Sequence, residues 1–164
     1  MEDSAQVTQL STVVEPPLGI FEAKCDDKGR LKLPVRFAMF LKHSDVSRVF
    51  ITTIDLRSAR IYPEKVWESN QNFFDEPGDD TELAEDISFI ANLYGDFSTL
   101  DEHGRVLVPT NLRRKLEFEK QSVWLENYRG HINVHPRKVY EERMARALVG
   151  IGDKAKVLDR KGFR

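Results

Sequence analysis

Short apolar segments interleaved with polar residues recur in two regions of the chain, and this pattern predicts β-strands. Their β-branched and aromatic residues suit the pleated, half-buried surface of a sheet. The expected strands cover residues 19–24, 31–33, 49–54 and 59–62 in the first region and 94–100, 106–108, 122–125 and 131–134 in the second. Each region therefore supplies four short strands in the same order.

Helices are expected between and after these strands. Four of them start at a proline, which suits the first helical position because its missing N–H would have no partner there. These prolines are Pro34, Pro63, Pro109 and Pro136. The apolar positions at helical spacing after the first and third prolines are Phe37, Phe40, Leu41, Leu112 and Leu116. A fifth helix is expected at 81–93, with Leu83, Ile87, Ile90 and Ala91 on its inner face.

The chain repeats itself. Residues 26–34 read DDKGRLKLP and residues 101–109 read DEHGRVLVP, so Asp, Gly, Arg and Pro recur at an offset of 75. A second match, between PEKVWE at 63–68 and PRKVYE at 136–141, follows at an offset of 73. Two matches in the same order are improbable by chance. We therefore expect one β-turn-β-α-β-β-α unit used twice, in a β-rich α+β fold.

The expected organisation follows from the repeat. A single unit of this size buries little apolar surface, so the two units should share one core. The expected segments are a disordered leader at 1–18, a first unit at 19–73, an acidic linker and connecting helix at 74–93, a second unit at 94–148, and a mobile basic tail at 149–164.

Charge is distributed unevenly along the chain. The net charge of the 164 residues is −2, but residues 1–20 carry −3, residues 21–67 carry +4, residues 68–86 carry −8 and residues 87–164 carry +5. The acidity is therefore confined to the leader and the linker, while both repeats are basic. Local positive charge attracts phosphate, so the acidic total does not argue against a DNA-binding protein.

Several classes of protein are not expected. No apolar stretch is long enough to span a membrane, and the N-terminus does not read as a secretory signal. The single cysteine, Cys25, has no internal disulfide partner, and a zinc site is not expected. We find no motif for a nucleophile, a phosphate-binding loop or metal ligation. A cytoplasmic protein that is not an enzyme, with no cofactor, no metal and no small-molecule substrate, is therefore expected.

The repeated Asp-x-x-Gly-Arg motif places an arginine just past a tight turn, beside a carboxylate. A guanidinium can contact O6 and N7 of guanine with two hydrogen bonds, and the carboxylate could hold it in one orientation. The alternative is an ion pair within the chain that only ties down the turn. The candidate residues are Asp26 and Arg30 in the first repeat and Asp101 and Arg105 in the second.

Further basic residues surround each motif. They would contact phosphates, which position a protein on DNA without specifying sequence. The candidates are Lys28, Lys32 and Arg36 in the first repeat and His103 and Arg113 in the second.

This arrangement resembles the MraZ family. The resemblance rests on the tandem Asp-x-x-Gly-Arg with proline four residues after each arginine, and extends over roughly residues 19–147. Gly19, seven residues before Asp26, and Trp67, after the Arg-Ile-Tyr-Pro segment, also fit the family. The arginine that often ends the first motif is Ala38 here, whereas the second motif keeps it as Arg113.

The resemblance implies two swapped-hairpin units of the AbrB/SpoVT type that form a pseudo-symmetric, double-psi-like barrel core. It also implies a nucleoid-associated transcription regulator that assembles into a homo-oligomeric ring. In the family, such a ring binds short direct repeats of double-stranded DNA in the promoter of its own division and cell-wall operon. The motif turns of both repeats would make the DNA contacts.

Two other functions stay open. An AbrB-fold antitoxin would bind DNA and also a toxin partner through its C-terminus. A ring-forming scaffold would use the motif arginines to close its interfaces and would not read DNA sequence. Substitution of the arginines separates these functions, because a scaffold would lose assembly whereas a regulator would lose DNA binding.

Overall fold

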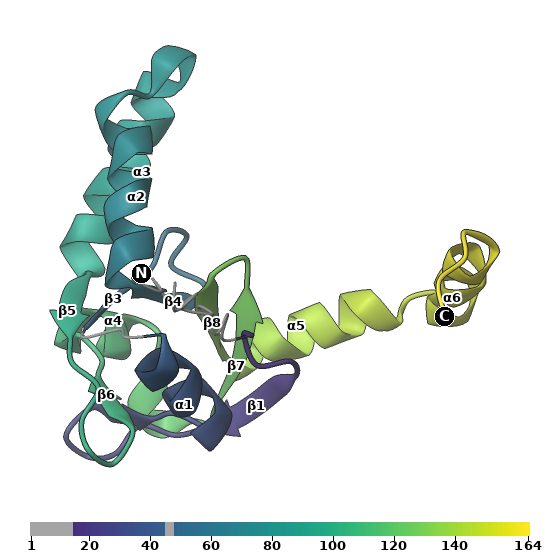
Figure 1. The fold of residues 1–164 in the computed structure, drawn as a ribbon, viewed down its shortest axis with the longest axis horizontal. Helices are drawn as coiled ribbons and strands as arrows, with labels where there is room; N and C mark the ends of the chain where they lie inside the picture. The colour runs from purple at the N-terminus through teal and green to yellow at the C-terminus, as the bar shows by residue number, and fades with distance from the viewer. Residues whose placement is uncertain (1–14, 45–47) are drawn as a thin grey trace, which may run out of the picture.

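The computed structural model describes residues 15–44 and 48–164, so most of the expected leader at 1–18 lies outside the described residues (Figure 1). The strands are β1 (Ile20–Ala23), β2 (Arg30–Lys32), β3 (Val49–Thr52), β4 (Ala59–Pro63), β5 (Asp96–Ser98), β6 (Arg105–Leu107), β7 (Val123–Tyr128) and β8 (His131–Pro136). The α-helices are α1 (Val35–His43), α2 (Glu64–Asp75), α3 (Thr81–Tyr94), α4 (Thr110–Lys115), α5 (Arg137–Leu148) and α6 (Ile151–Arg160), and two short 3₁₀ helices are η1 (Gly78–Asp80) and η2 (Phe118–Lys120).

The strands form two antiparallel sheets. Six of them lie in the order β1-β7-β8-β4-β3-β5, and β2 pairs with β6 in a second, two-stranded sheet. In the large sheet, β1 of the first repeat pairs with β7 of the second, and β5 of the second pairs with β3 of the first. The first strand of each repeat therefore completes the sheet of the other repeat.

The strand order of the large sheet is symmetric. If each strand is replaced by its equivalent in the other repeat, the result is the same order read from the opposite end. Strands β4 and β8, which are equivalent in the two repeats, pair with each other at the centre of the large sheet. Strands β2 and β6, also equivalent, pair in the small sheet. The topology thus has the symmetry of two interleaved units.

The main apolar core lies between the two sheets and the short helices α1 and α4. Its largest fully buried side chains come from both repeats and include Leu31, Phe37, Ile61, Phe118, Leu125 and Ile132. Phe37 faces the core from α1, as its helical spacing predicts, and Phe21 packs edge-on against it with ring centroids 5.6 Å apart. Residues of both repeats therefore contribute to the same core.

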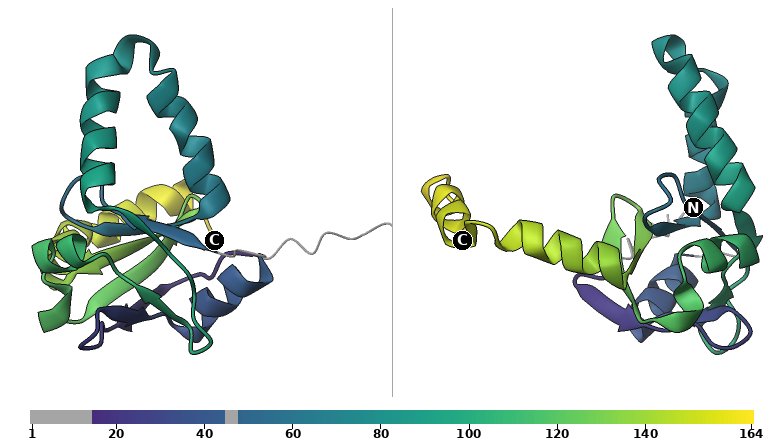
Figure 2. Two further views of the ribbon diagram at one scale, coloured as in Figure 1. Left: turned by 90° about the vertical axis from the view of Figure 1, so that its left-hand side faces the viewer. Right: turned by 180° about the vertical axis from the view of Figure 1, so that it is seen from behind.

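Two helical extensions leave the large sheet in different directions (Figures 1 and 2). Helices α2 and α3 form a hairpin, which we call the acidic arm (residues 64–94). A small aromatic cluster anchors its base, where Phe50 of β3 stacks on Trp67 with ring centroids 4.4 Å apart. Helices α5 and α6 follow β8 on another side, and no residue of either helix is buried.

The structure differs from the sequence-based expectations at several places. Helices contribute more residues than strands. The expected α+β class is therefore correct, but the description as β-rich applies to the core and not to the whole chain. The four prolines lie one position before their helices, at the N-cap. Leu83 is 62% exposed, and Ala84 is buried on α3 instead. Residues 149–164, expected as a mobile tail, contain helix α6. Within the described ranges, no helix is both long and apolar enough to cross a membrane.

Candidate nucleic-acid interface

The two Asp-x-x-Gly-Arg motifs meet at one end of the molecule. Each forms the turn that leads into β2 or β6, and these two strands pair antiparallel. Each turn also bonds to the residue that follows the strand of the other repeat, because the Leu33 N–H donates to the Gly104 carbonyl (2.9 Å) and the Val108 N–H donates to the Gly29 carbonyl (3.0 Å). Two motifs that lie 75 residues apart in the sequence therefore form one surface, which we call the paired turns (residues 26–30 and 101–105).

The Asp26 carboxylate organises the first turn. Its Oδ1 accepts the backbone N–H groups of Lys28 (3.0 Å) and Arg30 (2.9 Å), and its Oδ2 accepts Nε of Arg30 (2.7 Å). Both oxygens are thus used inside the turn. The aspartate caps the turn and fixes the direction of the arginine next to it.

The second turn has the same geometry. Oδ1 of Asp101 accepts the backbone N–H groups of His103 and Arg105, each at 2.9 Å, and Oδ2 accepts Nε of Arg105 at 2.8 Å. Nη1 of Arg105 also lies 3.8 Å from Oδ2 of Asp26, across the junction between the turns. The two arginines are therefore held in one cluster with both carboxylates.

The hydrogen bonds keep both carboxyls ionised. Donation from the Arg30 backbone N–H, followed by the Arg30 side chain and the Lys28 backbone, holds the pKa of Asp26 below its usual value. Desolvation alone would raise the pKa of Asp101, but the hydrogen bonds from Arg105 and His103 outweigh it and the pKa is lowered. Each arginine thus stays beside a negative charge at neutral pH.

The arginines keep part of their guanidinium groups accessible. The side chains of Arg30 and Arg105 are 33% and 25% exposed, and the Nε of each donates a hydrogen bond to the aspartate of its own turn. Among residues 15–44 and 48–164, no acceptor forms a hydrogen bond with the Nη atoms of Arg30. The ion pair expected as an alternative to DNA reading is therefore present, and it leaves the outer edge of the guanidinium available.

The other candidate cations are unevenly distributed over the two repeats. Lys28, Lys32, Arg36 and His103 are exposed around the paired turns. Arg36 also lies over the ring of Phe21, with Cζ 5.7 Å from the centroid. The position of Lys32 is taken in β6 by Leu107, which is 53% exposed. The first turn is therefore the more positively charged of the two.

Arg113 does not lie where a phosphate contact is expected. Its side chain is only 13% exposed, and its Nε donates to Oε1 of Glu119 (2.7 Å) while Nη1 donates to the Val108 carbonyl (2.8 Å). The guanidinium packs beneath Gly29, so closely that a Cβ at that glycine would overlap it. Arg113 of the second repeat thus packs against the turn of the first repeat, and most of its side chain is covered.

The equivalent support beneath the second turn is much smaller. There Ala38 replaces the arginine, and a Cβ at Gly104 would meet the Ala38 Cβ at 3.4 Å. Both glycines have positive φ, 79° for Gly29 and 75° for Gly104, so each turn needs glycine for its backbone. The departure from the family pattern at Ala38 therefore makes the two turns unequal in packing.

A hydrogen-bonded chain on the opposite face of the large sheet was not expected from the sequence. Oγ of Ser58 lies 2.6 Å from Nδ1 of His135, and Nε2 of the same ring lies 2.9 Å from Oε1 of Glu126. The three residues come from the turn before β4 and from strands β8 and β7. Local sequence gives no signal for this contact, which depends on strand pairing. We interpret it as a structural link between the two hairpins.

Neither metal binding nor thiol chemistry is supported at the candidate site. Among residues 15–44 and 48–164, no three His, Cys, Asp or Glu side chains gather in a way that could hold a metal ion. Cys25 precedes the first turn, and burial raises the pKa of its thiol to about 12. The thiol is therefore protonated at neutral pH, when a reactive cysteine would be a thiolate.

No family model matches the chain. Several proteins similar in sequence share one name, the transcriptional regulator MraZ. The chain is 32% identical over 99 residues to the transcriptional regulator MraZ of Acidobacterium capsulatum, covering 60% of this chain and 68% of that protein. It is 30% identical over 130 residues to MraZ of Anaeromyxobacter dehalogenans strain 2CP-C, covering 77% and 88% of the two chains. This chain belongs to the MraZ family. A MraZ protein of Neisseria meningitidis serogroup A is 27% identical over 136 residues.

Membership of the MraZ family agrees with the residues that suggested it. The longer matches cover 77–79% of the chain, so the family extends over much more than the repeated motif. These relatives are named transcriptional regulators. The paired turns contain the motif on which the resemblance rests, so their geometry carries the most weight for function.

Proposed function

We propose that this chain is a DNA-binding transcriptional regulator that reads double-stranded DNA with its paired turns. The observation that carries the proposal is the pair of arginines, Arg30 and Arg105, each fixed by an aspartate and partly exposed at the junction of the two turns. The names of the MraZ relatives support the same function.

Each arginine is held by its aspartate in one orientation in the absence of DNA. Because Nε is bonded to aspartate, the outer nitrogens of the guanidinium remain as donors to O6 and N7 of guanine, the commonest contact in specific recognition. A side chain that is already ordered loses less entropy on binding. The carboxylates do not face DNA without compensation, since each is neutralised by its arginine and by backbone N–H groups.

The exposed cations around the turns would supply contacts that do not depend on sequence. Lys28, Lys32, Arg36 and His103 surround the arginines and could bind phosphate oxygens. The acidic arm projects away from the small sheet of β2 and β6, beside which the paired turns lie (Figures 1 and 2). Its eight carboxylates at 68–86 therefore lie away from the proposed DNA surface, where they would repel it least.

The finer parts of the proposal concern the target and the assembly. We expect short direct repeats in the promoter of the chain's own division and cell-wall operon to be the target, and a homo-oligomeric ring to be the binding form. A ring would present several copies of the paired turns to repeated sites, so avidity would offset weak single contacts. Such a regulator would act in the cytoplasm, on the nucleoid.

The test is fluorescence anisotropy with a labelled duplex from upstream of the chain's own coding sequence, measured beside a scrambled duplex. We expect the wild type to prefer its upstream DNA. Arg30→Ala and Arg105→Ala should each reduce that preference about 5- to 150-fold, because one arginine–guanine pair contributes about 1–3 kcal/mol of discrimination. Arg143→Ala, at an exposed arginine of α5, is the matched control and should bind as the wild type does.

Sedimentation of the same variants separates the regulator from the alternatives. Variants that keep the wild-type mass but lose sequence preference support the regulator. If the arginine variants lose assembly, and the wild type shows no preference for its upstream DNA, the ring-forming scaffold replaces the regulator. The antitoxin alternative would require DNA binding to persist together with capture of a toxin, and no contact of the described residues favours it.

A further inference from the structure

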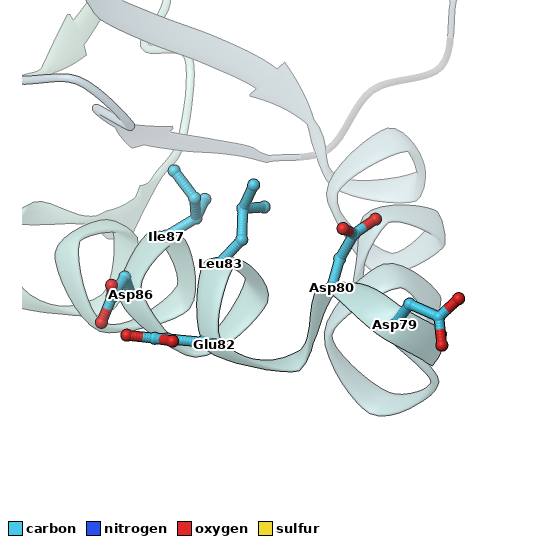
Figure 3. A pocket seen from close by; sticks show the side chains of 6 residues that line it. All are labelled: Asp79, Asp80, Glu82, Leu83, Asp86 and Ile87. Atoms are coloured by element: carbon cyan, nitrogen blue, oxygen red, sulfur yellow. The ribbon is translucent and has the colours of Figure 1, made fainter.

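The acidic arm carries a groove with an apolar wall, and within the described residues no other element lines this groove. A groove of about 540 Å³ lies along the start of α3, and Leu83 and Ile87 form its apolar wall. Figure 3 shows these two side chains projecting in the same direction from α3. Leu83 is 62% exposed, although its spacing predicted an inward position.

Carboxylates line the groove beside this apolar wall. The other residues that line the groove are Asp79, Asp80, Glu82 and Asp86 (Figure 3). No basic residue occurs anywhere in 68–86. An occupant must therefore offer apolar side chains to Leu83 and Ile87 and positive charge to the rim, which is the chemistry of a basic amphipathic helix.

The chain itself contains such a helix at α6. Ile151, Ala155 and Leu158 follow one another at i, i+4 and i+7, so they form one apolar stripe. Lys154 and Lys161 lie seven residues apart beside this stripe, because seven residues are close to two helical turns. Residues 149–164 carry five bases and two acids, a net charge of +3 against −8 on the arm.

Helix α6 has no partner within the described chain. Every one of its residues is exposed, including Ile151 at 52% and Leu158 at 47%. An isolated helix of this length is marginal in water, so a stable α6 needs a surface to pack against. The acidic arm of the same chain projects elsewhere from the sheet (Figures 1 and 2), which favours the arm of another copy.

We infer that α6 of one copy docks in the acidic, apolar groove on the arm of a second copy. The contact joins two different surfaces, so each chain offers one groove and one helix. A contact of this kind repeats from copy to copy and closes into a ring when the rotation allows. The inference rests on the self-association included in the proposed function, and it names the surfaces that produce it.

Two substitutions on neighbouring residues of α6 test the apolar part of the contact. Leu158→Asp places a charge on the stripe, whereas Val157→Asp places one off the stripe at a similar exposure of 43%. We expect Leu158→Asp to weaken self-association about 10- to 100-fold, the effect of losing one buried leucine at an interface. Val157→Asp should sediment as the wild type does. Equal behaviour of the two variants would overturn the inference.

Charge reversal tests which surfaces meet. One full-length variant carries Glu82→Lys and Asp86→Lys on the arm, and the other carries Lys154→Glu and Lys161→Glu on the tail. Each alone weakens the attraction and should sediment as smaller species, because the first variant lowers the net charge of the arm from −8 to −4 and the second changes that of residues 149–164 from +3 to −1. Mixed in equal amounts, the two variants can alternate, so that unchanged arms meet unchanged tails at half of the contacts and the reversed side chains face each other at the other half, and the mixture should recover the wild-type mass. Failure of the mixture to recover would overturn the inference.

The two proposals fail in different ways. DNA binding is measured separately, with a duplex that carries a single site, and Leu158→Asp should leave that affinity close to the wild-type value. A wild type that stays monomeric at every concentration would overturn both self-association and this inference, while sequence preference at the paired turns would stand. A wild type that assembles and is unaffected by the α6 and arm variants would overturn the inference alone.

Discussion

At the scale of single residues, one substitution between the repeats makes the two turns unequal. The Arg113 guanidinium lies beneath Gly29, whereas only Ala38 lies beneath Gly104. Arg113 is also fixed by Glu119 and by the Val108 carbonyl, so it cannot move aside without breaking both hydrogen bonds. The first turn therefore packs against a fixed arginine side chain, whereas the second packs against the methyl group of Ala38.

This difference predicts unequal costs for the same substitution. Gly104→Ala should destabilise the fold by about 1–2 kcal/mol, the cost of a left-handed backbone at a residue with a Cβ. Gly29→Ala should cost roughly 2–4 kcal/mol, because it also displaces Arg113 from its partners. Urea unfolding of both variants measures the two values.

A double-mutant cycle identifies the cause. In an Arg113→Ala background, Gly29→Ala should cost about as much as Gly104→Ala, because the side chain that obstructs the Cβ has been removed. An excess cost that persists without Arg113 would contradict this assignment.

At the scale of elements, each turn is held by an aspartate whose pKa is lowered in the folded chain. The unfolded chain therefore binds more protons in acid, and stability rises with pH. The contribution is complete above the ordinary carboxyl value of 3.8 and is lost as pH falls through the lowered values. The stability of the turns should thus decline in acid below about pH 4.

Asparagine at positions 26 and 101 tests this pH dependence. The variant Asp26→Asn/Asp101→Asn should be less stable than the wild type at pH 7, since it loses both ion pairs with Arg30 and Arg105. Its stability should fall less steeply between pH 5 and pH 3, because two of the shifted carboxyls are absent. Urea midpoints at pH 7, 5, 4 and 3 provide the comparison, and equally steep declines would contradict it.

Elements also show how far local sequence reasoning extends. The turns, the strands beside them and the core-facing Phe37 follow from glycine, alternation and helical spacing, which are local signals. The pairing of β1 with β7 does not, because any short strand can complete more than one edge. The burial of Arg113 does not follow from local signals either, because its neighbour Gly29 belongs to the other repeat and only the tertiary fold brings the two residues together.

At the scale of the whole molecule, charge is separated in space as well as in sequence. Exposed cations lie around the paired turns and along α5 and α6, whereas the eight acids of 68–86 lie on the arm. Overall net charge is therefore a poor guide to what the surface binds. The local charge at the turns should set the dependence of DNA binding on salt.

Salt titration tests this local charge. Removal of one cation that binds a phosphate should reduce the slope of log affinity against log salt by about 0.9. Lys28→Ala and Lys32→Ala should each lower the slope by about that amount and weaken upstream and scrambled duplexes alike. Lys138→Ala, at an exposed lysine of α5, should leave the slope unchanged. A slope that responds equally to Lys138 would place the phosphate contacts elsewhere.

The exchanged strands have a consequence for synthesis of the protein. Ile20 in β1 pairs with Glu126 in β7, so β1 has no partner strand until β7 has been synthesised. At typical bacterial rates of about 5–20 residues per second, β1 waits for several seconds as an unpaired edge. The first repeat therefore cannot finish folding ahead of the second, and both must complete the sheet together after translation has passed β7.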